Sequence, residues 1–177
     1  MLVAHGFGGL IALQEVKSHP DRVKGLMVID AATRSTMKVP EQQQRFFFKA
    51  LDTRYEDVLK MMMTRQGRDT TQGLEIYAQA QLVPPATIKA YLKAAMNVDA
   101  SGTLKDMKPA FLFVGSARLW PDTTAWATVA KQLGYEEAGP IATRRIKDSA
   151  ALIMKDQPDS LAAVIGEFAA RAIAAKK

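Results

Sequence analysis

The 177-residue sequence contains no cysteine and only two histidines, His5 and His19. The lack of cysteine excludes disulfide bonds, thiolate metal sites and a cysteine nucleophile. It also means that cysteine usage does not indicate the cellular compartment. No group of His, Asp and Glu has the spacing of metal ligands, so no metal is expected. Gly6, Gly8 and Gly9 lack the third-glycine spacing and the downstream acid of a dinucleotide-binding loop, so no cofactor is expected.

Long apolar runs are also lacking, since none approaches the roughly 18 residues of a membrane span. The N-terminus does not have the basic-then-apolar order of a signal peptide. We therefore expect no membrane partner and a cytoplasmic location. The formal net charge is +6, but Lys and Arg are scattered among the acids. Because a protein that reads nucleic acid gathers its basic residues on one face, a solvated surface explains this charge better than nucleic-acid binding.

What the chain does contain is a strand–helix–strand pattern near its start. With 48% hydrophobic residues, its length suits one globular core. The spacing of apolar residues predicts a helix over 8–18, and His19-Pro20 ends it. Its expected buried side consists of Leu10, Ile11, Leu13 and Val16. Short apolar runs at 25–31 and 110–114 predict parallel strands that are covered on both faces.

Between these two strands the pattern changes to helices without a strand candidate. The expected helices lie at 41–51, 55–63, 74–82 and 86–96. We interpret 40–97 as an inserted helical unit, and 1–39 with 98–177 as the α/β core.

The C-terminal part of the core has its own signals. Asp122 is the expected N-cap of a helix that Gly134 ends. A strand at 141–146 carries charged residues, which suits an edge of the sheet. The last helix has apolar residues at i, i+3, i+4 and i+7, namely Leu161, Val164, Ile165 and Phe168, and Asp156 and Asp159 lie near its positive end.

The N-terminal segment is the most informative motif. Residues 2–13 read LVAHGFGGLIAL, which indicates a strand, a glycine turn and the start of a helix. This resembles the G-x-S-x-G elbow of α/β-hydrolases, with Gly6 in the place of the nucleophilic serine. Residues 113–121 resemble the loop of the family's catalytic acid, and 148–159 resemble its histidine loop. Because these landmarks occur in the family's order around a helical insertion, nearly the whole chain resembles the C-terminal part of an α/β-hydrolase.

This resemblance implies a partial α/β-hydrolase-like parallel sheet flanked by helices, with 40–97 as a helical lid. It places Arg118 where the family has its acid and Ala151 where it has its base. A serine attacks only when an imidazole takes its proton and an acid orients that imidazole. With Gly6, Arg118 and Ala151 at these positions, we expect the triad chemistry to be lost. The N–H of Phe7 would supply one oxyanion donor, whereas the family's second donor lies in a preceding part of the fold.

Five side chains remain as candidates for other roles. His5 either packs beside the elbow or acts as an acid or base. Asp30 either takes the place of an alternative acid or caps a turn. Ser116 and Ser149 would offer hydroxyl groups to the pocket, but each needs a base within hydrogen-bond reach. Arg118 is either an exposed loop residue or an anion-binding guanidinium.

The elbow strand is expected to form an uncovered edge of the sheet, because the part of the fold that precedes it in the family is not encoded here. Unpaired backbone groups at 2–4 would invite pairing with another chain. We therefore expect a homo-oligomer, or a complex with a partner chain, through this edge.

The leading hypothesis is a truncated, catalytically inactive α/β-hydrolase-like protein, a pseudoenzyme that binds a small apolar ester, an anionic ligand or a partner. The alternative is a weak esterase or lactonase that uses His5, a water molecule and the Phe7 N–H. Two further hypotheses remain open: a subunit whose missing half comes from another polypeptide, and a fragment with no separate role.

Overall fold

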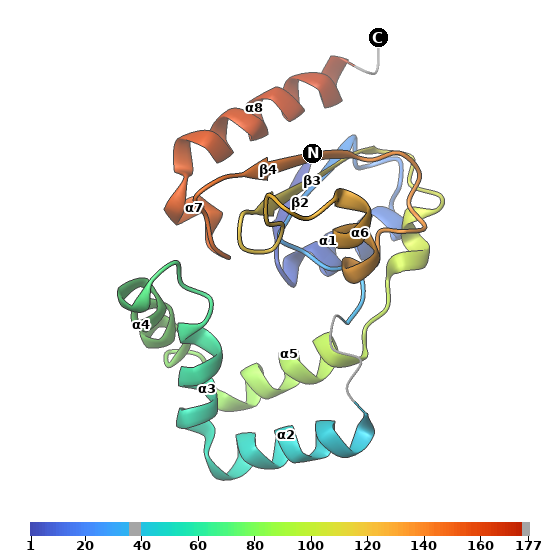
Figure 1. Cartoon of the computed structure of the whole chain (residues 1–177). Helices are drawn as coiled ribbons and strands as arrows, with labels where there is room; N and C mark the ends of the chain where they lie inside the picture. Colours follow the sequence, from blue (N-terminus) through green and yellow to red (C-terminus); the bar gives the residue numbers. More distant parts are fainter. Residues whose placement is uncertain (36–39, 175–177) are drawn as a thin grey trace. The chain divides into compact units, whose positions relative to one another are not determined.

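The computed structural model describes residues 1–35 and 40–174. The chain divides into two compact units, of which the first comprises Met1–Thr36 with Val98–Lys177 and the second comprises Met37–Asn97. Figure 1 shows a parallel sheet with helices in the first unit and helices alone in the second.

The sheet of the first unit has four parallel strands in the order β1-β2-β3-β4. They span Leu2–His5, Gly25–Ile29, Ala110–Ser116 and Ala142–Ile146. The pairing of β2 with β3 joins the parts of the sequence that precede and follow the helical unit, and it places Val28 beside Phe113. Among the described residues, β1 and β4 each pair with one strand, so both are edges.

Alternation along the two central strands gives the sheet an apolar surface on each face. Leu26 and Val28 point into a core that includes Leu13 of α1 (Gly8–Ser18) and Val129 of α6 (Trp126–Leu133). Met27 and Ile29 point into a second core. This second core is covered by α8 (Pro158–Ala174) through Leu161 and Phe168. The sheet is therefore the middle layer of three.

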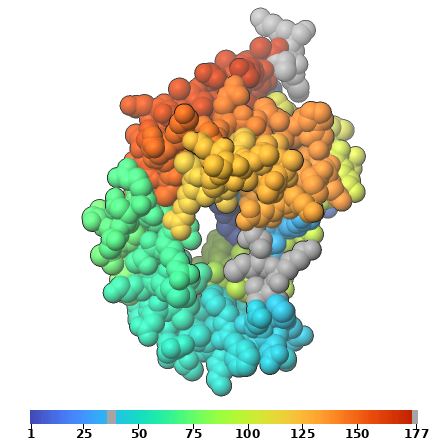
Figure 2. All heavy atoms as spheres, in the orientation of Figure 1, coloured from blue at the N-terminus to red at the C-terminus, as the bar shows by residue number. Residues whose placement is uncertain are grey.

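Shorter elements complete the first unit. They are the 3₁₀ helix η1 (Ser101–Leu104) and the four-residue helix α7 (Ile153–Asp156), which comes just before α8. On the face shown in Figure 2, the atoms that follow β3 in the sequence, coloured yellow to red, form one packed surface.

The second unit contains four helices in its described part, α2 (Glu41–Thr53), α3 (Tyr55–Thr64), α4 (Thr70–Ala80) and α5 (Pro85–Asn97). Leu51 and Leu59 are fully buried. The α4 helix begins four residues earlier than predicted, because the Asp69 carboxylate accepts a hydrogen bond from the Gln72 N–H at 2.9 Å and caps it.

Two sequence predictions in the core are wrong. Asp122 does not cap α6, which begins at Trp126 after Ala125; its carboxylate instead forms an ion pair with Arg145 of β4. Ile11 does not lie on the buried side of α1, where Leu13 and Val16 are buried, because 58% of its surface is exposed. Gly134 ends α6 as predicted, in a left-handed conformation with φ of 87°.

Candidate functional site at the carboxyl ends of the strands

The turn after β1 is a tight strand-to-helix elbow. The Gly6 N–H continues the ladder by donating to the Ile29 carbonyl at 2.9 Å, and the Gly9 N–H donates back to the Gly6 carbonyl at 3.0 Å. Gly6 has φ of +54°, in the left-handed region that favours glycine. A Cβ at Gly9 would lie 2.5 Å from that of Ala31, whereas a Cβ at Gly6 would have nothing within 4 Å. The elbow therefore presents open space directly above Gly6.

His5, the last residue of β1, connects this elbow to the loop before α7. Its Nε2 lies 2.7 Å from the Ala151 carbonyl oxygen. A carbonyl only accepts hydrogen bonds, so Nε2 carries the proton in this contact. The structure thus brings together His5 and Ala151, which the sequence singled out at opposite ends of the chain.

Asp30 follows β2 directly and holds the end of β3. It has φ of 44°, and its Oδ1 accepts a hydrogen bond from the Ser116 N–H at 2.7 Å. The Ser116 side chain also hydrogen bonds to this carboxylate. Burial raises the pKa of Asp30, while the bonds from Ser116 and the nearby His5 and Arg118 oppose the shift. This geometry is that of a capping carboxylate between two strand ends.

The two candidate serines lie deeper than the sequence suggested. Ser116 is the last residue of β3 rather than part of a loop, and it is fully buried. Its Oγ accepts a hydrogen bond from the Leu119 N–H at 3.1 Å. Ser149 donates to the Ile146 carbonyl at 2.7 Å and accepts from the Ala117 N–H at 3.3 Å. Both hydroxyl groups are thus bonded to the protein itself.

Arg118 is exposed in the loop after β3. Its backbone N–H donates to the Ser149 carbonyl at 3.2 Å, which ties this loop to the one after β4. With His5, Asp30 and Ser116, it completes a group of polar residues where the carboxyl ends of all four strands meet. We call this group, together with Gly6, Ser149 and Ala151, the carboxyl-end site. Ligands of open parallel sheets bind at this edge.

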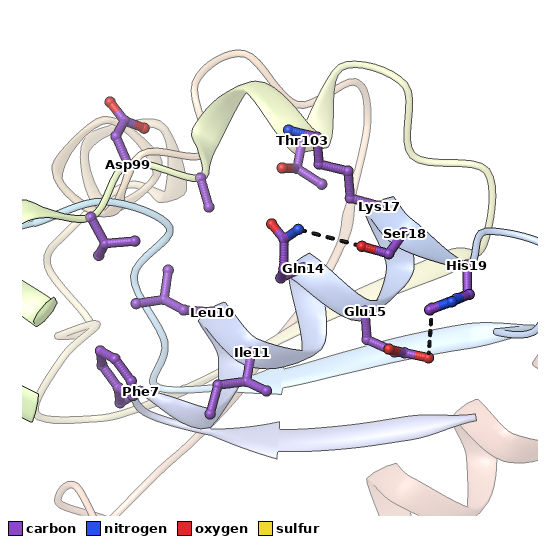
Figure 3. A pocket seen from close by; sticks show the side chains of 12 residues that line it. Phe7, Leu10, Ile11, Gln14, Glu15, Lys17, Ser18, His19, Asp99 and Thr103 are labelled. Atoms are coloured by element: carbon purple, nitrogen blue, oxygen red, sulfur yellow. Dashed lines mark hydrogen bonds and ion pairs between the residues drawn. The ribbon is translucent and has the colours of Figure 1, made fainter.

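A groove that the sequence did not predict runs along the outer side of α1. It encloses about 490 Å³, and Phe7, Leu10 and Ile11 lie at one end of it (Figure 3). Polar residues continue along the helix, where Gln14 bonds to Ser18 and Glu15 pairs with His19. The adjacent pair Leu10-Ile11 was the available signal, because residues next to each other on a helix do not face the same way.

The described residues offer neither a metal site nor a membrane-spanning helix. Within residues 1–35 and 40–174, no group of three or more His, Cys, Asp or Glu residues is arranged to hold a metal ion. The same part of the chain has no helix with the length and apolar character of a membrane span.

Comparison with known proteins gives different answers for sequence and structure. The sequence matches no protein-family model and none of the curated proteins compared with it. A thermophilic esterase from Thermogutta terrifontis aligns over 97% of this chain and 64% of its own, at 18% identity and a TM-score of 0.71. A hydrolase from Oleispira antarctica aligns over 94% and 63%, at 16% identity and a TM-score of 0.70. An N-acyl homoserine lactone degrading enzyme aligns over 94% and 66%, at 20% identity and a TM-score of 0.69.

The fold is that of the α/β-hydrolases. The α/β-hydrolase resemblance and the partial parallel sheet predicted from the sequence are thereby confirmed. This chain spans less than two thirds of the length of the three structures. At identities of 16 to 20%, these structural similarities establish the α/β-hydrolase fold alone, and function has to be argued from the site.

Proposed function

We propose that this chain uses the α/β-hydrolase fold to bind a ligand or a partner and does not hydrolyse esters by a Ser-His-acid triad. The observation that carries this proposal is the elbow itself, where Gly6 offers no side-chain nucleophile at the turn. In the family resemblance, this position belongs to the serine.

The groups around the elbow support the same conclusion. A hydroxyl becomes a nucleophile only when a base within hydrogen-bond reach takes its proton. Ser149 donates to a backbone carbonyl instead, and Ser116, which bonds to the Asp30 carboxylate, is fully buried and so cannot reach a substrate. The Nε2 of His5 donates to the Ala151 carbonyl, so this nitrogen is not placed to accept a proton.

The ligand best suited to this proposal is a small apolar ester or an anion. Space above Gly6 leaves room for a compact group. The exposed Arg118 guanidinium at the same edge would bind a carboxylate or phosphate. The helical unit would then act as the lid that the family resemblance implies.

The test is hydrolysis of a panel of short-chain esters and lactones by the wild-type chain and by Gly6→Ser. We expect neither to turn over substrate, because a serine at position 6 would still lack a base to take its proton. Gly8→Ser is the matched control, since Gly8 also has open space for a Cβ but lies outside the nucleophile position. Turnover by Gly6→Ser but not Gly8→Ser would refute the loss of the base, and turnover by the wild-type chain would refute the whole proposal.

A weak hydrolase is the second candidate, favoured by the position of His5 beside the elbow and within electrostatic reach of Asp30. His5 would act on a water molecule, and the Phe7 N–H would stabilise the oxyanion. Its signature is wild-type turnover that His5→Ala abolishes and that His19→Ala leaves unchanged.

We further propose that β1 binds a second copy of the chain or a partner chain. Its outer edge has no strand partner among the described residues, and Val3 is 41% exposed. An unpaired apolar edge is a template for strand addition. Light scattering at micromolar concentration should give a mass above that of the monomer, and Val3→Pro should reduce it. A monomeric wild-type chain would rule out self-association, and failure to retain a second polypeptide would rule out the partner.

A further inference from the structure

A second cavity lies at the opposite end of the sheet from the carboxyl-end site. It encloses about 160 Å³ and is lined by residues from the amino ends of β3 and β4 and from α8. Ala110, the first residue of β3, borders it, whereas Ser116 at the other end of that strand belongs to the carboxyl-end site. We call it the α8 cavity.

The cavity arises from small side chains under a helix. Ala142, Arg144 and Ile146 alternate along β4 and lie on one face of the strand. Ile146 is buried in the core beneath α8, which identifies this face as the one turned toward the helix. Toward the start of β4, Ala142 takes up much less volume, so a gap remains between the helix and the sheet.

The floor of the α8 cavity is apolar. Leu112 and Phe168 line it, and only 5% and 6% of their surfaces are exposed. An apolar cavity of about 150 Å³ is large enough to bind benzene. A volume of 160 Å³ therefore matches one aromatic ring.

Charged side chains surround this floor. Arg144 on β4 and Arg171 on α8 are both exposed lining residues, and Glu167 lies one turn before Arg171. Within the described part of the chain, none of the three forms an ion pair. Arg144 donates one hydrogen bond to its neighbour, the Thr143 carbonyl, at 3.1 Å, which leaves most of its donors free. The rim thus carries two guanidinium groups against one carboxylate.

We propose that the α8 cavity is a binding site for small aromatic carboxylates. The ring lies on the floor against Phe168 and Leu112, and the carboxylate lies between the guanidinium groups of Arg144 and Arg171. Guanidinium groups match the planar geometry of a carboxylate, and the apolar floor selects against fully hydrated anions. Glu167 repels the ligand and limits its affinity. This site is independent of the function proposed for the carboxyl-end site.

The experiment is a titration of the isotope-labelled full chain with benzoate, in which NMR measures the amide chemical shifts. We expect saturable shifts confined to β4, the start of β3 and α8. Benzamide and benzylamine have the same ring with no charge and with a positive charge, and both should bind more weakly. Replacing either arginine by glutamine should weaken benzoate binding about threefold, since exposed ion pairs are weak, and the double substitution should weaken it further.

Three controls decide the outcome. Arg22→Gln removes the same charge from an exposed residue outside the cavity and should leave the affinity unchanged. Glu167→Gln should tighten binding, because it removes the repelling charge. Ala142→Trp should fill the cavity and abolish binding, and the arginine variants still decide the question if that protein does not fold. Equal affinity for benzoate and benzamide, unchanged binding by the double variant, or no saturable shift up to the solubility limit would overturn the proposal.

Discussion

In the first unit, polar groups at one end of the parallel sheet are hydrogen bonded within the protein, whereas charged groups at the other end have no ion-pair partner among the described residues. At the carboxyl ends, Asp30, Ser116, Ser149 and His5 bond to one another or to the backbone, and they join all four strand ends. At the amino ends, Arg144, Glu167 and Arg171 surround an apolar cavity without ion pairs among the described residues. Polar groups that satisfy each other contribute to stability, whereas unpaired charges over an apolar floor keep their capacity to bind a ligand. The comparison predicts large stability effects at the first end and small ones at the second.

The largest effect is expected at Asp30. Asp30→Ala removes the acceptor of two hydrogen bonds from buried Ser116 and puts a Cβ without a polar group at a left-handed φ of 44°. The free energy of unfolding should fall by about 3 kcal/mol. Urea denaturation at neutral pH measures it, and a loss below about 1 kcal/mol would contradict the bridging role.

Asp30→Asn is the matched variant, because it keeps an oxygen acceptor and tolerates the left-handed region. Burial raises the pKa of Asp30 above 3.8 in the folded chain, so the folded state binds the proton more tightly than the unfolded state. Its contribution to stability is therefore fully present below the unfolded pKa and is lost as pH rises through the folded pKa. The stability of Asp30→Asn relative to wild type should increase over this range, and a flat difference would contradict the shift.

Ser149→Ala should have the next largest effect. The hydroxyl accepts from the Ala117 N–H and donates to the Ile146 carbonyl, so its removal leaves both groups without this partner. We expect a loss of about 2 kcal/mol in the free energy of unfolding. Ser160→Ala, at an exposed position of α8, is the control and should change stability little. Equal effects of the two substitutions would show that the hydrogen bonds of Ser149 do not contribute to stability.

A smaller effect is expected from His5→Ala, which removes the single hydrogen bond to the Ala151 carbonyl. The cost should be about 1 kcal/mol. His5→Gln offers a side-chain N–H donor and should restore part of it. Amide hydrogen exchange in 148–153 provides a local measurement, and unchanged protection in His5→Ala would show that this bond does not hold the loop.

The smallest effect belongs to the amino ends. Arg171→Gln removes a charge with no ion-pair partner among the described residues, so stability should change by less than about 0.5 kcal/mol. Thermal denaturation beside Asp30→Ala makes the contrast direct. A loss at Arg171 as large as that at Asp30 would mean that the α8 cavity is held together by its charges, and the comparison would fail.

The strands and most helices were predictable because local patterns determine them. The apolar run around Val28 is typical of a strand covered on both faces, and the structure has β2 there. Asp122 was predicted wrongly because capping preference is local, whereas its attraction to Arg145 depends on the tertiary fold. The bond between Asp30 and Ser116 could not be derived either, because it depends on the register of strands separated by the whole helical unit.

The α8 cavity shows the same limit from another side. The sequence gives the apolar stripe of α8, with Phe168 buried as expected. It does not show that Ala142 lies beneath that helix, because the position of a small residue under a helix follows from strand register and packing. A cavity depends on how the residues around it pack, and those residues come together only when the chain folds.

The junction of the two units has a consequence for how this chain can be rebuilt. The Ser35 N–H donates to the Val98 carbonyl at 3.0 Å, and Arg34 forms an isolated antiparallel bridge with Asp99. The residues that lead into the helical unit and out of it are therefore adjacent, at a distance that a few glycines and serines can span. The helical unit should thus be exchangeable for a short linker, or for the corresponding segment of another protein with this fold, and with the linker the sheet would fold around a much shorter loop closure.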